Sequence, residues 1–389
     1  MLYPSEDFVL DAIPNHSDAL YDFMVTAVSL LRWWRTPLWL LQLGTGAKSF
    51  VDNPILGSRR LNGAGLHVLR IRAAHGLARW RRRRLARRVP AELRAQFDRD
   101  GFIVVRDVLP PEAFRKVRQT LMELDLESRE QQQGDTITGR VPVGPEILQS
   151  EPGLGELLRS STWSGALAYV ASTRSKPLYY LQTIVGGVLP GMPDPQIELH
   201  ADTFHPSMKA WLFLTDVGVD DRPLTYVAGS HRIDPARIEW ERRKSIEVLS
   251  TGDRLSQRGS LRISVEDLKG LGLPSPTRFC VPANTLVVAD TCGFHARAHS
   301  QKRSLRIELW AYSRCSPFLP WTGGGLLSWG PIADRRTQWI ASILDQLDQR
   351  GWRKQHWQKV GRRRLTNLVR DFRRDHGSIS VPSPADADA

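Results

Sequence analysis

The chain has 389 residues, of which 41% are hydrophobic, so it can bury one large core and still carry flanking segments. Its 54 Lys and Arg against 41 Asp and Glu give a formal net charge of +13, which favours an anionic partner. The three cysteines, Cys280, Cys292 and Cys315, lack zinc-ligand spacing and an even count, which argues against a zinc module and a disulfide framework.

The N-terminal residues indicate where in the cell the protein is expected. Residues 1–22 begin with acidic side chains and lack the basic start and apolar run of a secretory signal, so export is not expected. The apolar stretch 23–43 is interrupted by Arg32, Arg35 and Pro37, so the sequence predicts no transmembrane helix. We expect a cytoplasmic protein, with peripheral contact at the inner membrane surface as a further hypothesis.

Residues 1–92 are predicted to form a basic, Trp/Arg-rich helical N-terminal extension. A Trp/Leu-rich stretch covers residues 30–41, and an Arg-rich stretch covers residues 70–88. Close-packed arginines repel one another on a helix, and Trp and Leu beside them are typical of a helix that lies on an anionic membrane. A solvated polar face above an ordinary buried face explains the same pattern. Nucleic acid is not an expected partner, because no nucleic-acid-binding motif accompanies the arginines.

The sequence predicts a catalytic domain over residues 93–321. It opens with a short helix, a turn and a strand at 102–105, and Pro110-Pro111-Glu112 then begins a helix that runs through Leu124. Five later segments are short, β-rich and separated by turn residues: 178–185, 210–215, 224–228, 285–289 and 305–312. This pattern of short strands indicates an antiparallel sandwich or barrel.

Residues 322–377 are predicted to form a C-terminal helical extension. From Asp334 onward apolar residues recur at the spacing of a buried helical face, namely Trp339, Ile340, Ile343, Leu344 and Leu347. The segment becomes basic at 362–364. Residues 378–389 consist mostly of Ser, Pro, Asp and Ala and are expected to be a disordered tail.

The candidate metal site combines His200 and Asp202, just before one strand, with His295, just after another. Two histidines and one carboxylate fill one face of an octahedron and leave three positions open, an arrangement that suits Fe(II). Residues i and i+2 of an extended segment project to the same side, so His200 and Asp202 can converge on one ion. A His-x-Asp tripeptide alone is common by chance, and a lone histidine is more often structural, so the context has to support it.

Arg306 is the candidate ligand for an oxo-acid. It lies eleven residues after His295, in a strand that returns beside it, and its planar guanidinium suits a carboxylate. A surface arginine on a sheet face is the other interpretation, and Arg303 is the competing position.

Several motifs in one order resemble the phytanoyl-CoA dioxygenase family, over residues from about 100 to 321. They are Asp100-Gly101-Phe102-Ile103-Val104-Val105, Leu109-Pro110-Pro111-Glu112, the His200/Asp202 pair, Pro223-Leu224-Thr225-Tyr226-Val227-Ala228-Gly229-Ser230-His231-Arg232, and His295 with Arg306. The resemblance implies a mainly β core, a double-stranded β-helix of the jelly-roll, cupin-like kind, with flanking α-helices at both termini.

The resemblance also implies cofactors and a site. Fe(II) would be held by His200, Asp202 and His295, and 2-oxoglutarate by Arg306. Trp211, and Gln182 or Leu181, would form walls of the oxo-acid pocket. The chain departs from the family at two places: Arg297 replaces a small hydroxylated residue, and Asp221-Arg222 replaces an Asn-Gly surface turn. His231 is expected to be structural, His205 could line the site, and His299 is the fallback for the distal ligand.

The expected function is that of an Fe(II)/2-oxoglutarate-dependent dioxygenase that hydroxylates an unactivated C–H bond of a small or lipid-linked, anionic substrate. Hydroxylation would be coupled to decarboxylation of 2-oxoglutarate to succinate. Two alternatives stay open: a catalytically inactive β-helix binding protein, and a basic membrane-surface adaptor whose His-x-Asp is accidental.

Overall fold

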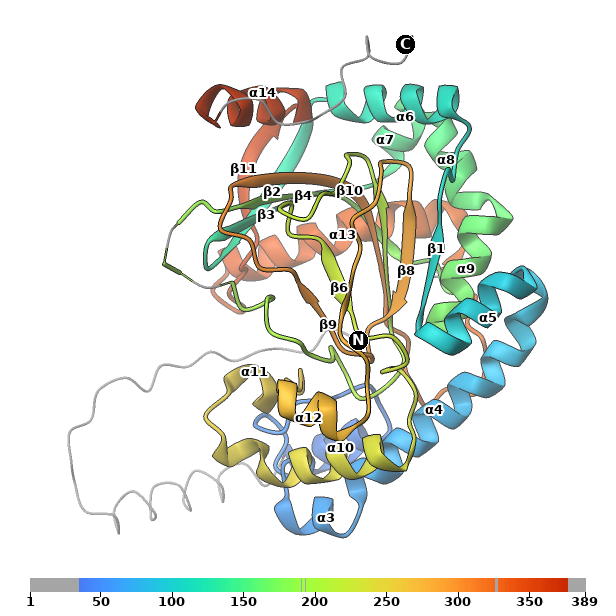
Figure 1. Cartoon of the computed structure of the whole chain (residues 1–389), viewed down its shortest axis with the longest axis vertical. Helices are drawn as coiled ribbons and strands as arrows, with labels where there is room; N and C mark the ends of the chain where they lie inside the picture. Colours follow the sequence, from blue (N-terminus) through green and yellow to red (C-terminus); the bar gives the residue numbers. More distant parts are fainter. Residues whose placement is uncertain (1–34, 190, 193, 326–327, 377–389) are drawn as a thin grey trace.

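The computed structural model describes residues 35–189, 191–192, 194–325 and 328–376. Its core consists of two antiparallel sheets (Figure 1). The larger sheet has the spatial order β1 (Phe102–Val105), β8 (Leu286–Asp290), β5 (Met208–Phe213), β10 (Ser304–Ser313), β4 (Leu178–Gly186), β3 (Thr136–Pro142), β2 (Leu126–Gln133) and β11 (Gln358–Arg363). The smaller sheet has the order β7 (Thr277–Arg278), β6 (Leu224–Tyr226) and β9 (His295–Arg297). The predicted double-stranded β-helix is confirmed.

Helices flank the sheets, and they come from segments before, between and after the strands. Before and beside β1 lie α2 (Thr36–Leu43), α3 (Arg59–Gly63), α4 (Leu66–Leu85), η2 (Ala86–Arg88), α5 (Ala91–Asp100) and α6 (Pro111–Glu123). Between β3 and β4 lie α7 (Pro145–Ser150), α8 (Pro152–Arg159) and α9 (Ser161–Ala171). Between β6 and β7 lie α10 (Pro235–Glu247), η3 (Val248–Ser250), α11 (Arg254–Gln257) and α12 (Val265–Gly270), and α13 (Gly330–Gln349) and α14 (Leu365–His376) follow β10. In the described part of the chain, every helix is too short or too polar to cross a membrane.

The alternation along β10 shows how the sheet separates core from site. Leu305, Ile307 and Leu309 pack into the main hydrophobic core, which the helices cover. Arg306 and Trp310 point to the opposite face and line a cavity. Because successive side chains of a strand point to opposite faces, one strand supplies both the apolar core and the polar wall of the site.

The structure confirms all five predicted strands, the strand at 102–105 and the helix that begins after Pro110. It also contains β2 and β3, which the sequence did not predict, because their segments are rich in Glu, Gln and Thr. Both strands lie near the edge of the sheet, where polar side chains are tolerated.

The predicted C-terminal helical extension contains the helices α13 and α14, but β11 lies between them and pairs with β2. The predicted buried face of α13 is wrong in part. Trp339 and Ile343 are 48% and 43% exposed. The buried residues of α13 are instead Ala333, Thr337, Ala341 and Asp345. Asp345 faces inward because it pairs with buried Arg129 of β2 at 2.6 Å. The expected disorder of 378–389 lies outside the described residues.

Part of the predicted Arg-rich helix is structural. Arg81 is 2% exposed and donates to the backbone oxygens of Ser172 and Leu319. Arg82 pairs with buried Asp290 at 2.8 Å. The structure therefore uses these charges to fix α4 against the β-helix, and the remaining exposed arginines of α4 face solvent.

Candidate metal centre and its cavity

His200 and His295 are brought together by the backbone. The two residues exchange both backbone hydrogen bonds of an antiparallel bridge, each N–H···O distance being 3.0 Å. Residues that face each other in this way project their side chains to the same side. The imidazole ring centroids are consequently 4.6 Å apart.

Both imidazoles are oriented as metal ligands. Nδ1 of His200 lies 2.7 Å from the backbone oxygen of Glu198, and Nδ1 of His295 lies 3.0 Å from that of Gly293. A carbonyl oxygen only accepts, so each Nδ1 carries the proton and each Nε2 keeps its lone pair. Burial lowers the pKa of His200 to about 3, and burial also lowers the pKa of His295. Both rings are therefore neutral at neutral pH, as ligation requires.

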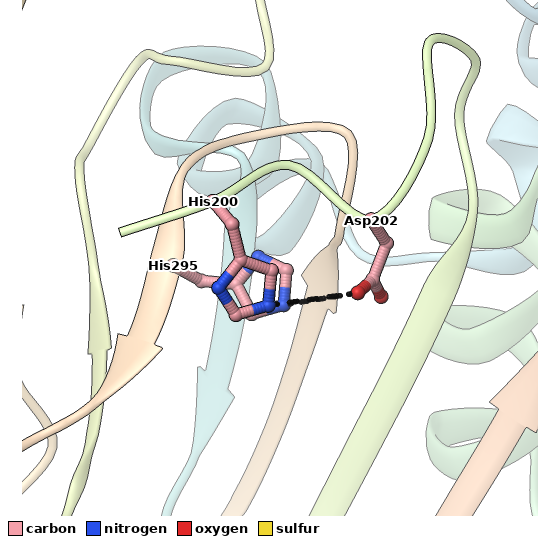
Figure 2. A group of neighbouring side chains, drawn as sticks. All are labelled: His200, Asp202 and His295. Atoms are coloured by element: carbon pink, nitrogen blue, oxygen red, sulfur yellow. Dashed lines mark ion pairs between the residues drawn. The ribbon is translucent and has the colours of Figure 1, made fainter. Parts of the chain in front are cut away.

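Asp202 completes the group (Figure 2). Its Oδ1 lies 3.8 Å from Nε2 of His200 and 3.7 Å from Nε2 of His295, and the three side chains point toward one another. Its second oxygen, Oδ2, pairs with Nζ of Lys209 at 2.7 Å. Burial by itself would raise the pKa of Asp202, but the positive charge of Lys209 holds it well below its usual value. One carboxylate oxygen thus faces the histidines while a lysine neutralises the other.

The donor set fits Fe(II). The three ligand atoms lie within 4.8 Å of one another, and within the described residues this is the one cluster of His, Cys, Asp and Glu side chains that can hold a metal ion. Two imidazole nitrogens and one carboxylate oxygen on one side of a site match the facial arrangement that leaves positions open for an oxo-acid and dioxygen.

The cluster opens into a cavity of about 480 Å³. All six predicted site residues line it: His200, Asp202, His295, Arg306, Trp211 and Gln182. Leu181, the alternative to Gln182, packs instead into the main core. The fallback His299 and the competing Arg303 are both exposed and do not line the cavity.

Arg306 is held by a buried polar network that crosses three strands. Its Nε lies 2.9 Å from Oε2 of Glu308, which is fully buried. Gln182 on β4 donates to Glu308 at 2.6 Å and accepts from Nε of Arg140 on β3 at 2.8 Å. The network fixes two guanidinium groups in the cavity wall before any ligand binds, which lowers the entropic cost of binding an anion.

Arg222 is not on the surface, contrary to the expectation for the Asp221-Arg222 turn. It is 1% exposed, adopts a positive φ of 53° and pairs with Asp135 at 2.7 Å. Its backbone oxygen accepts a hydrogen bond of 2.6 Å from Arg306. The arginine occupies the left-handed position where the resembling family has glycine, and the buried ion pair with Asp135 compensates for the strain.

Two further histidines of the sequence analysis, His231 and His205, do not line the cavity. His231 is buried against Phe97, with ring centroids 5.2 Å apart, which agrees with a structural role. His205 is fully buried and does not line the cavity. Arg297 does line it and pairs with buried Asp194.

One residue near the metal centre was not predicted from the sequence. Lys48, from the N-terminal segment, donates to the backbone oxygen of Asp202 at 2.5 Å. No motif marks this lysine, because the contact spans 154 residues of sequence.

Comparison with known proteins agrees with the site. Residues 97–247 match the family model described as phytanoyl-CoA dioxygenase (PhyH). The family resemblance is confirmed. The phytanoyl-CoA dioxygenase match contains His200 and Asp202 but ends before His295 and Arg306, which the structure brings to the same cavity. The match and the His-Asp-His cluster together confirm the predicted enzyme class, a non-haem iron- and 2-oxoglutarate-dependent dioxygenase.

Solved structures give more distant similarities. The non-haem α-ketoglutarate-dependent epimerase SnoN from nogalamycin biosynthesis is 19% identical, with a TM-score of 0.37 over 57% of this chain and 81% of that chain. HygX from Streptomyces hygroscopicus, with nickel and 2-oxoglutarate bound, is 18% identical, with a TM-score of 0.33 over 57% of this chain and 85% of that chain. EctD from S. alaskensis, with bound Fe, is 15% identical, with a TM-score of 0.33 over 58% of this chain and 76% of that chain. No curated protein matches the sequence.

Proposed function

We propose that this enzyme hydroxylates an unactivated C–H bond of a small or lipid-linked anionic substrate. His200, Asp202 and His295 would hold Fe(II), and Arg306 would bind the far carboxylate of 2-oxoglutarate. The observation that carries the proposal is the convergence of two neutral imidazoles and one carboxylate oxygen on one point at the base of a cationic cavity.

When bound, Fe(II) together with 2-oxoglutarate and dioxygen supplies the oxidising chemistry, and 2-oxoglutarate leaves as succinate and carbon dioxide. The residues of the chain hold and orient the metal ligands, and they exclude water from the site. The Glu198 and Gly293 carbonyls fix the two imidazoles, and Lys209 fixes the carboxylate of Asp202. Trp211 and Trp310 supply apolar walls that limit access of water to the reacting bond.

The anionic nature of the substrate is supported by the charges on the cavity wall. Six cations line it, namely Arg140, Lys209, Arg262, Arg297, Arg306 and Arg314, whereas Asp202 is the one acidic residue that does so among the described residues. Lys209, Arg262, Arg297 and Arg306 have carboxylate partners. In the described part of the chain, Arg140 and Arg314 form no ion pair with a carboxylate.

Arg140 and Arg314 differ in position. The guanidinium of Arg140 lies 4.0 Å from the ring centroid of Trp310 and 4.3 Å from that of Trp357. It sits beside the network of Arg306, so it belongs to the oxo-acid side of the cavity. Arg314 is exposed and follows β10. It lines the same cavity as Asp202, and we place the substrate anion beside it.

The metal and oxo-acid part of the proposal is tested by anaerobic titration of Fe(II) and 2-oxoglutarate into the full-length protein. We expect a weak visible charge-transfer band in the wild type and its loss in His200→Ala. The matched control is His299→Ala, which removes an exposed histidine and should keep the band. Absence of the band in the wild type, with iron bound no more tightly than by His200→Ala, contradicts the proposal.

The substrate part is tested by oxygen consumption with 2-oxoglutarate and a panel of carboxylated, phosphorylated and neutral lipids and acyl thioesters. Anionic compounds should stimulate turnover more than their neutral counterparts. Arg314→Gln should raise the KM for the stimulating compound about tenfold and leave the KM for 2-oxoglutarate unchanged, as expected for one charge-assisted hydrogen bond. Iron and 2-oxoglutarate binding without any turnover would favour the alternative, an inactive binding protein.

A further inference from the structure

The N-terminal segment carries exposed apolar side chains that the catalytic site does not use. We call five of them together the N-terminal apolar surface: Leu38, Leu40 and Leu41 of α2, Val51 of the following loop, and Leu61 of α3. They are 50%, 54%, 62%, 51% and 43% exposed. Helix α2 has eight residues, mostly apolar, and none of them is buried.

Hydrogen bonds fix these elements to one another. The amide of Asn53 donates to the backbone oxygen of Trp39 at 3.1 Å and to the side chain of Gln42 at 2.7 Å, which joins the loop to α2. Nε of Arg70 donates to the backbone oxygen of Leu43 at 3.1 Å, which joins α4 to the end of α2. Asn62 donates to the backbone oxygen of Leu56 at 2.8 Å, which joins α3 to the loop. The exposed leucines are therefore presented by a fixed structure.

The same segment is strongly cationic. Residues 35–89 contain thirteen Lys and Arg and one acidic residue, Asp52. Some of these cations point inward, as Arg81 and Arg82 do. Others are exposed, and among them Arg59 and Arg60 begin α3 directly beside Leu61. The segment thus combines exposed leucines with exposed arginines, and Asp52 is its one acidic residue.

We propose that the N-terminal apolar surface docks the protein on an anionic lipid membrane. The leucines would enter the boundary between headgroups and acyl chains, while the arginines would contact lipid phosphates. Charge complementarity favours this occupant over a second copy of the chain, because two copies would oppose two cationic surfaces. Nucleic acid would satisfy the arginines but would leave the leucines of α2 in water.

Docking would also bring the metal centre close to the lipid. The N-terminal segment reaches that centre through Lys48, which lies between α2 and α3 in the sequence and contacts Asp202. In Figure 1, α3, α4 and α10 lie together at one end of the molecule, opposite the end that carries α6 and α14. A membrane at this end would leave the C-terminal helices free. The proposal does not depend on the reaction that the metal centre catalyses.

The experiment is co-sedimentation of the full-length protein with phosphatidylcholine vesicles that contain or lack phosphatidylglycerol. We expect binding to the vesicles that contain phosphatidylglycerol and much weaker binding to phosphatidylcholine alone. The double variant Leu40→Ser/Leu41→Ser should weaken binding tenfold or more, at roughly the transfer cost of one or two leucines. The double variant Arg59→Gln/Arg60→Gln should weaken it roughly 25-fold, about fivefold for each charge.

Two matched controls separate docking from general effects of hydrophobicity and charge. Val219→Ser removes a side chain that is 55% exposed in the loop between β5 and β6, and Arg278→Gln removes an exposed charge on β7. Both should bind vesicles as the wild type does. Unchanged thermal unfolding and iron binding in all four variants show that folding is intact.

The proposal is overturned if the wild type does not bind the anionic vesicles, or if the two N-terminal variants bind as tightly as the wild type. A dimer in light scattering that the leucine variant converts to a monomer, without vesicle binding, would assign the surface to a second copy and also overturn it. Equal binding to both kinds of vesicle would contradict the role given to the arginines.

Discussion

Lys48 donates a hydrogen bond of 2.5 Å to the backbone oxygen of Asp202, across 154 residues of sequence. Burial lowers the pKa of Lys48 to about 7, the positive charge of Arg314 adds to this effect, and Asp202 opposes it. Asp202 is therefore held twice, by Lys48 at its backbone and by Lys209 at its side chain. Both contacts position the carboxylate without occupying Oδ1, the oxygen that faces the histidines.

The first prediction concerns Lys48→Met. Loss of the hydrogen bond frees the backbone of Asp202, so we expect iron affinity to fall about tenfold, at the low end of what supporting contacts of metal ligands contribute. Anaerobic iron titration measures the change. Lys302→Met is the matched control, because Lys302 is exposed and pairs with Asp220 away from the cavity. Equal iron affinity in both variants would show that Lys48 does not position the ligand.

The second prediction concerns the attachment of α4. Arg82 is the partner of Asp290, whose side chain is 1% exposed. Arg82→Met leaves this carboxylate buried without its cation, which typically costs about 3–5 kcal/mol. The free energy of unfolding, from urea denaturation, should fall by that amount. Arg79→Met, at an exposed position of the same helix, should change it by less than about 0.5 kcal/mol.

Deletion of residues 1–92 extends this prediction. It removes Arg82 together with Arg81 and the contacts that both make to the segment around Ser172. We expect the shortened chain to be unfolded or aggregated, as judged by circular dichroism. A shortened chain that folds with the stability of the full-length protein would show that residues 93–389 fold without the N-terminal extension.

The third prediction concerns the oxo-acid. Arg306→Gln removes the guanidinium that we assign to the far carboxylate of 2-oxoglutarate, so the dissociation constant of 2-oxoglutarate should rise by about 10- to 100-fold. Isothermal titration with iron present measures it. Arg303→Gln, three positions earlier and exposed, should leave it unchanged. The reverse pattern would assign the oxo-acid to Arg303.

The fourth prediction is a pH dependence of stability that arises at Glu241. Burial alone would raise the pKa of Glu241, but Arg237, at 2.9 Å, and His67, at 3.0 Å, lower it from 4.5 to about 2. Because the pKa in the folded state is below that of the unfolded chain, the stabilisation is complete above about pH 4.5 and is lost as the pH falls toward about 2.

Urea denaturation at neutral pH and at several values below pH 4.5 tests this. The wild type should lose stability on acidification by an amount on the order of 3 kcal/mol more than Glu241→Gln, which cannot titrate. At neutral pH the variant should be the less stable of the two, because it leaves Arg237 buried without its carboxylate. Parallel acid profiles for the two proteins would contradict the assignment.

The sequence by itself determined the features that depend on local pattern. His200 and Asp202 stand two residues apart, a spacing that predicted side chains on the same side of the chain. The runs of apolar, β-branched and aromatic residues in β4, β5, β8 and β10 predicted strands in their own right. His295 and Arg306 could be assigned because several motifs occurred in one order, which placed them on successive strands of a known kind of fold.

The tertiary structure decided the features that depend on contacts between distant residues. Strands β2, β3 and β11 have polar sequences and form because their backbones pair with a sheet that already exists. Arg81 and Arg82 look like surface charges in the sequence, and only the carbonyls and the carboxylate of other segments turn them inward. Lys48 reaches the metal centre for the same reason. A pattern along the chain indicates which side of a helix or strand is apolar. The partner of a buried charge depends instead on which distant segment folding brings into contact with it.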